Sequence, residues 1–275
     1  MKIGIVIKNE QLKGDPRYKS LLSQLEQESY EVYQLNSKSD LRSGTDLVIC
    51  VGGDGTFLQA AQHVADVGIP ILGVNLGRLG FLSENSPESV VPALMSGEFS
   101  IEYRTMLNAT VRGRNARKDI GLLPYAVNEV SIHRKGLAVL GIHVTVNGAA
   151  LPTYWADGLL VATASGSTAY SLSVGGPICM PDAKVLIITP IAPHNLNVRP
   201  LVVPETADIE ISFSARDDKA ILTMDNQTVE IDTDWSVHVQ VAQFSLKRIR
   251  LSESEFVKAL TSKLFWGEDI RNTEN

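Results

Sequence analysis

Features that mark several large protein classes are scarce or absent in this sequence of 275 residues. It has two cysteines, Cys50 and Cys179, which offer neither a disulfide framework nor a metal-binding spacing. Its net charge is -6, whereas proteins that bind nucleic acid usually carry a basic face. The apolar run at residues 3–7 is too short for a signal peptide or a membrane span. We therefore expect a cytoplasmic protein that binds neither nucleic acid nor a membrane.

Motifs of several common enzyme classes are also missing. The sequence has no Walker A lysine motif and no G-x-G-x-x-G after a strand, which disfavours a P-loop kinase and a standard dehydrogenase. Gly166-Ser167-Thr168 lacks the spacing of a nucleophile elbow, so a serine hydrolase is disfavoured. The histidines lack zinc-like spacing with cysteine or glutamate; they are His63, His133, His143, His194 and His238. We expect any metal to arrive with a nucleotide phosphate, as Mg²⁺ usually does.

The two parts of the chain have different periodicities. Up to about residue 100, apolar runs at 2–7, 31–35, 47–51 and 71–74 alternate with helical spacing at 16–30, 56–67 and 86–97, which predicts a parallel α/β sheet. Strand-length runs then follow at 106–111, 127–133, 142–146, 159–163, 185–188, 209–213, 220–224, 237–241 and 246–251, with a hairpin signal at Asn147-Gly148. We expect this part to be all-β. A capping box at 252–255 predicts a last helix to about Phe265.

The stretch Gly52-Gly53-Asp54-Gly55-Thr56 lies between a predicted buried strand and a predicted helix. Glycines permit close approach of a ligand, and a helix N-terminus attracts anions. A carboxylate is unfavourable there unless it has a chemical task, such as accepting a hydroxyl proton during phosphoryl transfer. The alternative is an ordinary turn with a solvated aspartate, but the glycines and the threonine exceed what a turn requires. We predict that Asp54 is a general base.

Three further stretches carry candidate site residues. Residues 75–82 contain Arg78 between two glycines, which suits either a phosphate-facing loop or an ordinary one. Asn128-Glu129 lies inside an apolar strand, so at least one member is expected to be buried and paired; the pair alone favours a structural hydrogen bond. The segment 163–177 is rich in Ser, Thr and Gly. We interpret it as a helix N-terminus against a ligand, with Tyr170 offering a stacking face, rather than as a flexible linker.

Taken together and in this order, these motifs resemble bacterial NAD kinases. The resemblance rests on residues 52–56, on Asn128-Glu129 and on the block 166–173, with similar segments at 75–82 and 190–201. The glycine-rich aspartate turn also occurs in diacylglycerol and sphingosine kinases and in 6-phosphofructokinases. The other two motifs therefore select NAD kinase.

The resemblance implies a fold and a reaction. The fold would be a Rossmann-like parallel α/β domain, residues 1–100 with 252–275, plus a β-rich NAD-binding domain, residues 101–251, the last helix returning to the first domain. The reaction would transfer the γ-phosphoryl group of ATP or polyphosphate to the 2′-hydroxyl of the adenosine ribose of NAD, giving NADP, with Mg²⁺. The family is typically a homodimer or homotetramer whose NAD site takes residues from a neighbouring subunit.

The resemblance also assigns residues. Gly52, Gly53, Thr56 and Arg78 would lie on the phosphate-donor side. NAD-binding residues would be Asp54, Gly55, Phe81, Asn128, Glu129, Asp157, Thr168, Ala169, Tyr170, Ser171, Leu172, Ser173 and Gln227.

Two positions depart from the family pattern. Ala164 replaces a proline, which should loosen the approach to the 166–173 block, and Asn226 replaces a glycine, which asparagine tolerates in a turn. Neither changes the predicted base. The alternatives are a lipid kinase that shares the aspartate turn and a dinucleotide sensor that binds without turnover.

Overall fold

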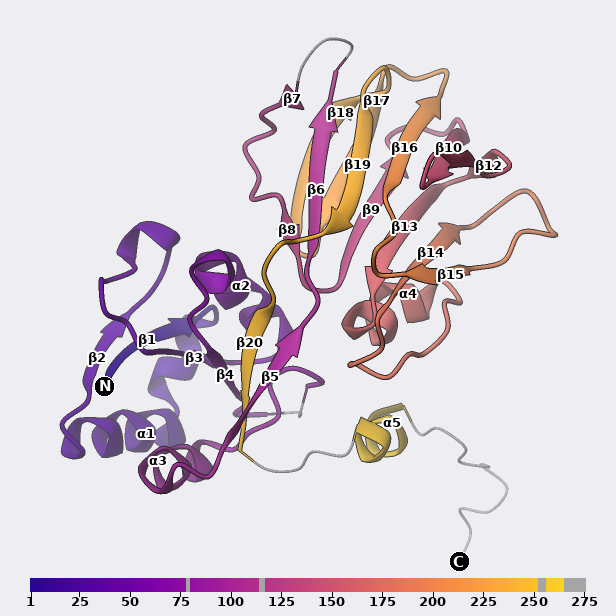
Figure 1. Cartoon of the computed structure of the whole chain (residues 1–275). Helices are drawn as coiled ribbons and strands as arrows, with labels where there is room; N and C mark the ends of the chain where they lie inside the picture. The colour runs from indigo at the N-terminus through magenta and orange to yellow at the C-terminus, as the bar shows by residue number, and fades with distance from the viewer. Residues whose placement is uncertain (78–79, 114–116, 252–255, 265–275) are drawn as a thin grey trace, which may run out of the picture. The chain divides into compact units, whose positions relative to one another are not determined.

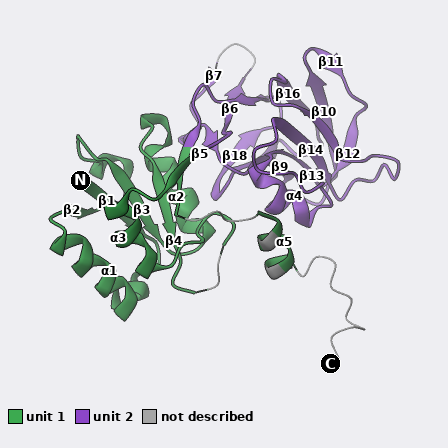
Figure 2. Ribbon diagram, turned by 60° about the horizontal axis from the view of Figure 1, so that its bottom comes forward, with its two compact units in different colours: residues 1–102, 247–275 green, residues 103–246 purple. Residues whose placement is uncertain are grey.

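The computed structural model describes residues 1–77, 80–113, 117–251 and 256–264. The chain forms two compact units, Met1–Glu102 with Lys247–Asn275, and Tyr103–Leu246 (Figure 2). Each unit has its own sheets and its own core. Among the described residues, no helix combines the length and the apolar character that crossing a membrane requires.

The first unit is built on a six-stranded sheet of order β2-β1-β3-β4-β20-β5 (Figure 1). The pairs β1–β2, β1–β3, β3–β4 and β4–β20 are parallel. Its strands are β1 (Lys2–Ile7), β2 (Glu31–Gln34), β3 (Leu47–Val51), β4 (Ile71–Val74), β5 (Ser100–Arg104) and β20 (Leu246–Arg250). Strands β3 and β4 are buried at every residue, as expected for central strands of a covered parallel sheet.

The helices of this unit begin and end at recognisable signals. Asp15 caps α1 (Pro16–Gln27), accepting a hydrogen bond from the Arg17 N–H at 2.9 Å. Helix α3 (Pro87–Ser96) stops at Gly97, which has a φ of 72°. The remaining elements are α2 (Asp54–Val64), α5 (Phe256–Leu264) and three 3₁₀ turns, η1 (Glu10–Gly14), η2 (Lys38–Asp40) and η3 (Ala65–Val67). The predicted capping box at 252–255 and the predicted helix end at 265 lie outside the described residues.

Helix α2 begins earlier than its predicted start at Thr56. The Gly53 carbonyl accepts hydrogen bonds from the N–H groups of Thr56 and Phe57, at 2.9 and 3.3 Å, so the first turn forms around Asp54. Asp54 therefore occupies the first helical position instead of the turn before the helix. This fixes the direction of its backbone on a regular element.

One predicted strand joins a different sheet from the one we expected. The run at 246–251 was predicted among the strands of the β-rich part, but β20 lies beside β4, with Arg248 opposite Ile71. Its neighbour β5 was not predicted at all. An apolar run does not reveal which sheet it will join. Here the buried Arg248 pairs with Glu84 and Glu102, both in the first unit, and those charges favour this location.

The second unit contains two antiparallel sheets that share one apolar core. One has the order β11-β10-β16-β19-β6-β7, with β12 on β10 and β8 on β6; the other has the order β15-β14-β13-β9-β17-β18. The strands of the first sheet are β6 (Leu107–Arg112), β7 (Arg117–Lys118), β8 (Tyr125–Ala126), β10 (Leu140–Val146), β11 (Ala149–Ala150), β12 (Tyr154–Ala156), β16 (Ile209–Ser214) and β19 (Ser236–Val241). Those of the second are β9 (Glu129–Arg134), β13 (Gly158–Thr163), β14 (Val185–Ile191), β15 (Leu201–Pro204), β17 (Lys219–Met224) and β18 (Gln227–Asp232).

Two local features of this unit bear on the predictions. The hairpin predicted at Asn147-Gly148 is confirmed: it joins β10 to β11, and the φ angles of both residues are positive, 51° and 80°. The segment predicted as a helix N-terminus is instead a 3₁₀ turn, η4 (Ser165–Thr168), followed by a single helical turn, α4 (Tyr170–Ser173). Gly166 packs so closely on the Asn128 carbonyl that a Cβ atom at this position would overlap it.

Candidate active site

The first group of predicted residues surrounds the Asp54 carboxylate. Its Oδ2 atom accepts a hydrogen bond from the Phe81 N–H at 2.9 Å. Its Oδ1 atom accepts two, from the Leu82 N–H at 2.9 Å and the Ser83 N–H at 3.0 Å. An ionised carboxylate offers about four lone-pair positions, so one position on Oδ2 is left to accept a further donor. Three bonds thus orient the carboxylate, while one acceptor site has no donor among the described residues.

Glycines allow the chain to come this close. A Cβ atom at Gly80 would overlap the Asp54 carboxylate, and one at Gly52, where φ is 149°, would overlap the Thr56 side chain. Gly53 and Gly55 are exposed on the turn, and Thr56 is buried below it. Arg78, predicted on the same side, lies outside the described residues.

Cationic side chains hold the carbonyl groups of the loop after β4. Arg17 Nη2 donates to the Leu76 oxygen at 2.5 Å, and Arg248 Nε donates to the Leu82 oxygen at 3.2 Å. Arg248 Nη2 also pairs with Glu84 at 2.6 Å. These contacts come from α1 and β20, so two separate elements hold the loop that orients Asp54.

The second group lies in the second unit, around Asn128 and Glu129, whose side chains are both buried. The Asp225 carboxylate accepts hydrogen bonds from three successive N–H groups, those of Val127, Asn128 and Glu129, at 2.7, 2.8 and 3.2 Å. Asp225 sits in the turn between β17 and β18 with a φ of 49°. We did not predict it as a site residue, although an Asp-Asn pair between two apolar runs is a turn signal.

Burial and a like charge act on this acid pair. Burial, together with the neighbouring Asp225 charge, raises the pKa of Glu129 to about 8, against the Tyr170 backbone N–H, which lowers it. Burial also raises the pKa of Asp225 to about 6, against the three backbone N–H groups, which lower it. Glu129 is therefore largely protonated at neutral pH in the free protein.

Three buried polar atoms in this group have no hydrogen-bond partner in the described part of the chain: Glu129 Oε2, Ser171 Oγ and Gln227 Nε2. Buried polar atoms are normally paired, and these three belong to residues predicted to bind NAD. They lie on β9, α4 and β18.

Tyr170 packs on His133, one of the histidines that lack zinc-like spacing. The Tyr170 and His133 rings are stacked, with centroids 5.8 Å apart and an interplanar angle of 19°. His133 also contacts the Ser131 hydroxyl at 2.9 Å. The other block residues, Thr168, Ala169, Leu172 and Ser173, are partly or fully exposed on η4 and α4.

Asp157 lies apart from Asn128 and Glu129. In the pairing of β9 with β13, Glu129 is opposite Ala162 and His133 is opposite Gly158. Asp157, which precedes Gly158, is therefore at the far end of the strand pair from Glu129. The rise of an extended chain puts it roughly 15 Å from Glu129. There it forms a two-pronged ion pair with Arg134, at 2.7 Å to Nε and 3.2 Å to Nη2. Within one chain, Asp157 does not join the Glu129 group.

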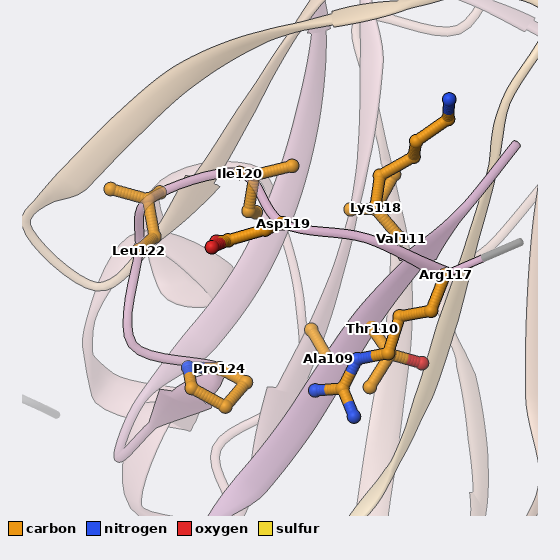
Figure 3. Close-up of a pocket in the computed structure, with 9 residues that line it drawn as sticks. All are labelled: Ala109, Thr110, Val111, Arg117, Lys118, Asp119, Ile120, Leu122 and Pro124. Atoms are coloured by element: carbon orange, nitrogen blue, oxygen red, sulfur yellow. The ribbon is translucent and has the colours of Figure 1, made fainter.

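These two groups of predicted residues coincide neither with a metal-binding cluster nor with a cavity of the second unit. Among the described residues, no three His, Cys, Asp or Glu side chains are placed to hold a metal ion. A cavity of about 320 Å³ lies against β6, and none of the predicted site residues lines it (Figure 3). Its lining residues are Ala109, Thr110, Val111, Arg117, Lys118, Asp119, Ile120, Leu122 and Pro124.

Comparison with known families assigns the chain. The ATP-NAD kinase N-terminal domain matches residues 6–96, and the ATP-NAD kinase C-terminal domain matches residues 127–251. The chain belongs to the NAD kinase family. The predicted resemblance and the predicted α/β plus β-rich fold are thereby confirmed.

Individual NAD kinases are similar over most of their length. The enzyme of Flavobacterium psychrophilum is 37% identical, over 96% of this chain and 90% of that protein. That of Porphyromonas gingivalis is 42% identical, over 82% and 78%. Among solved structures, an NAD kinase from Archaeoglobus fulgidus in complex with ATP is 26% identical with a TM-score of 0.78, covering 96% of this chain and 99% of that one. Yeast NADH kinase complexed with NADH shares the fold, at 23% identity and a TM-score of 0.88, over 100% and 90%.

We predict that Gly80→Ala lowers the free energy of unfolding by about 1–3 kcal/mol, the usual cost of overpacking, because its Cβ would displace the Asp54 carboxylate. The matched control in the same loop is Gly77→Ala, whose Cβ would meet only the Asn75 Oδ1 atom at 3.7 Å. Urea denaturation measures both. Equal stability of the two variants would contradict the close packing of Gly80 on Asp54.

We predict that Glu129 makes unfolding stability depend on pH. Its folded-state pKa is raised above the ordinary value, so its contribution is fully present below about pH 4.5 and is lost as pH rises towards about 8. Glu129→Gln should therefore flatten the fall in stability over this window, relative to wild type and to the exposed-site control Glu26→Gln. Denaturation curves from pH 4.5 to 9 test this; parallel pH dependences for wild type and Glu129→Gln would contradict it.

Proposed function

We propose that the chain transfers the γ-phosphoryl group of ATP to the 2′-hydroxyl of the adenosine ribose of NAD, giving NADP and ADP. Membership of the NAD kinase family supports the reaction. The structural observation that carries it is the set of three unpartnered buried polar atoms on Glu129, Ser171 and Gln227 in the described chain, since all three belong to predicted NAD-binding residues. A ligand rich in hydroxyl groups supplies the missing partners.

Asp54 acts as the general base in this proposal. The open acceptor position on Oδ2 takes the hydrogen bond of the 2′-hydroxyl and then its proton, as the oxygen attacks the γ-phosphorus. The new oxygen–phosphorus bond forms while the bond from that phosphorus to the bridging oxygen of ADP breaks, and ADP leaves. Gly52, Gly53, Thr56 and Arg78 are proposed to face the donor phosphates, where the N-terminus of α2 favours anions.

Asn128 and Glu129 are proposed to bind ribose hydroxyls, with Asp225 holding their backbone in place. The hydroxyls donate to the Glu129 carboxylate, which favours its ionised form, so binding should draw a proton off this residue. Tyr170 offers the ring face not covered by His133 for stacking. The other proposed NAD contacts are Gly55, Phe81, Asp157, Thr168, Ala169, Ser171, Leu172, Ser173 and Gln227.

Metal, phosphate donor and assembly complete the proposal. Because the described residues form no metal-binding cluster, Mg²⁺ is proposed to enter as the ATP complex, held by phosphate oxygens and water. Polyphosphate is an alternative donor.

We also propose a homodimer or homotetramer, since Asp157 lies apart from Glu129 within one chain and would reach an NAD site only on a neighbouring subunit. Light scattering measures the assembly.

An assay of NADP formation from NAD, ATP and Mg²⁺ tests the activity directly. We expect NADP with ATP, and parallel reactions with polyphosphate identify the donor. Binding of NAD without NADP formation would favour a dinucleotide sensor. Phosphorylation of a diacylglycerol or sphingosine, with none of NAD, would replace the proposal with a lipid kinase.

We predict that Asp54→Asn lowers kcat by about 10²–10⁴-fold, the usual range for a general base, with little change in NAD affinity. Asp66→Asn, which removes the same charge on the exposed η3 turn, serves as the control and should keep wild-type kcat. Thermal unfolding shows whether the Asp54 variant keeps its fold. A folded Asp54→Asn protein with wild-type kcat would remove this residue from the role.

We predict that Asn128→Ala and Glu129→Gln raise the KM for NAD by about 10–100-fold, the equivalent of 1.5–3 kcal/mol for a hydrogen bond involving a charged group. The KM for ATP should stay unchanged. Glu230→Gln, an exposed change on β18, is the control. A rise confined to the KM for ATP would show that the pair does not bind NAD.

A further inference from the structure

Two side chains of the last helix, α5, contact the loop that orients Asp54. Lys263 Nζ donates a hydrogen bond to the Gly80 carbonyl oxygen and lies 4.5 Å from the centroid of the Phe81 ring. The Phe256 ring packs on the same ring, with centroids 6.2 Å apart. A cation over an aromatic face is attracted to it. Helix α5 therefore fixes both the Gly80 carbonyl and the adjoining Phe81 side chain.

The Gly80 carbonyl and the Phe81 N–H belong to the same peptide group. Its oxygen accepts from the Lys263 ammonium, and its N–H donates to Asp54 Oδ2 at 2.9 Å. Hydrogen bonds in such a chain polarise one another, so a positive charge at the oxygen strengthens donation from the N–H. The ammonium therefore acts on Asp54 without touching it. The oxygen it acts on, Oδ2, is the one with an open acceptor position.

We propose that Lys263 is a positioning residue for phosphoryl transfer, which orients and polarises the Asp54 carboxylate through the Gly80–Phe81 peptide group. This inference rests on the proposed function of Asp54 as the base. Lys263 fixes the orientation in which Oδ2 meets the substrate hydroxyl, and its charge polarises the N–H group that donates to that oxygen.

The charged groups around Lys263 come from three elements of the first unit. Burial lowers the pKa of Lys263 most; the carboxylates of Asp54 on α2 and Glu84 after β4 raise it, and Arg248 on β20 lowers it. The net shift is downward from the ordinary lysine value. Lys263 therefore loses its proton at a lower pH than an exposed lysine does, and its effect on Asp54 should end there.

The test compares Lys263→Met, Lys263→Arg and wild type in the NADP assay, with the exposed α5 change Val257→Ala as the control. Lys263→Met keeps an apolar stem but removes the charge and the donor, and we expect kcat to fall roughly 10–100-fold, as for a displaced catalytic group. The KM for NAD should change less than threefold. Lys263→Arg should restore most of kcat, and Val257→Ala should match wild type.

The pH profile of kcat separates this role from general support of the fold. Wild-type kcat should decline on the alkaline side as Lys263 deprotonates, and Lys263→Arg should lose that decline, because a guanidinium keeps its proton. Thermal unfolding establishes that each variant is folded.

Several results would overturn the inference. They are wild-type kcat in Lys263→Met, an equal loss in Lys263→Met and Lys263→Arg, or an unmoved pH profile in every variant. A rise in the KM for NAD at unchanged kcat would also overturn it. Failure of the proposed function is distinguishable, because wild type itself would then form no NADP.

Discussion

The first unit depends on one interaction, the bonding of the Asp54 carboxylate to three successive N–H groups of residues 81–83. Parallel strands end at the same edge of a sheet, so the segments that follow the neighbouring strands β3 and β4 meet there. The pairing extends one step beyond the strands, where the Gly52 N–H donates to the Val74 oxygen at 2.8 Å. Gly80 then lets the loop approach the carboxylate. Sheet topology brings the two segments together, and the hydrogen bonds of the Asp54 carboxylate hold them in place.

The second unit contains the same arrangement of one carboxylate and three successive N–H groups, with a different consequence. Asp225 also accepts three successive N–H groups, and the segment it holds carries Asn128 and Glu129 into the protein interior. Here the segment that Asp225 holds, and not Asp225 itself, bears the residues that we propose to bind NAD. The arrangement has a cost, because burial, and after it the neighbouring Asp225 charge, raises the pKa of Glu129 to about 8. A ligand that donates hydrogen bonds to Glu129 offsets this cost, which couples binding to ionisation.

The sequence predicted what depends on periodicity and missed what depends on tertiary position. Alternating runs such as 47–51 and 56–67 were sufficient for the parallel sheet, and the motif at 52–56 pointed to Asp54. The sheet that β20 joins was missed because the buried charge of Arg248, and not its apolar neighbours, finds partners there. Asp225 and Lys263 were missed as functional positions because each acts through the backbone of a distant segment. The sequence around Asp225 does not distinguish it from an ordinary aspartate in a turn, and the sequence around Lys263 does not distinguish it from an ordinary lysine in a helix.

The positive charges near Asp54 share one arrangement, which suits its proposed role as the base. Two peptide groups of the loop carry a cation at the oxygen and Asp54 at the N–H. Lys263 and Oδ2 flank the Gly80–Phe81 group, and Arg248 and Oδ1 flank the Leu82–Ser83 group. A direct ion pair would occupy a lone pair of the carboxylate and hold it against proton transfer. Acting through a peptide group, the cations orient both oxygens yet leave the last acceptor position of Oδ2 open to a hydroxyl. Arg248, which is buried and paired with Glu84 and Glu102, thus also orients Asp54 through one peptide group.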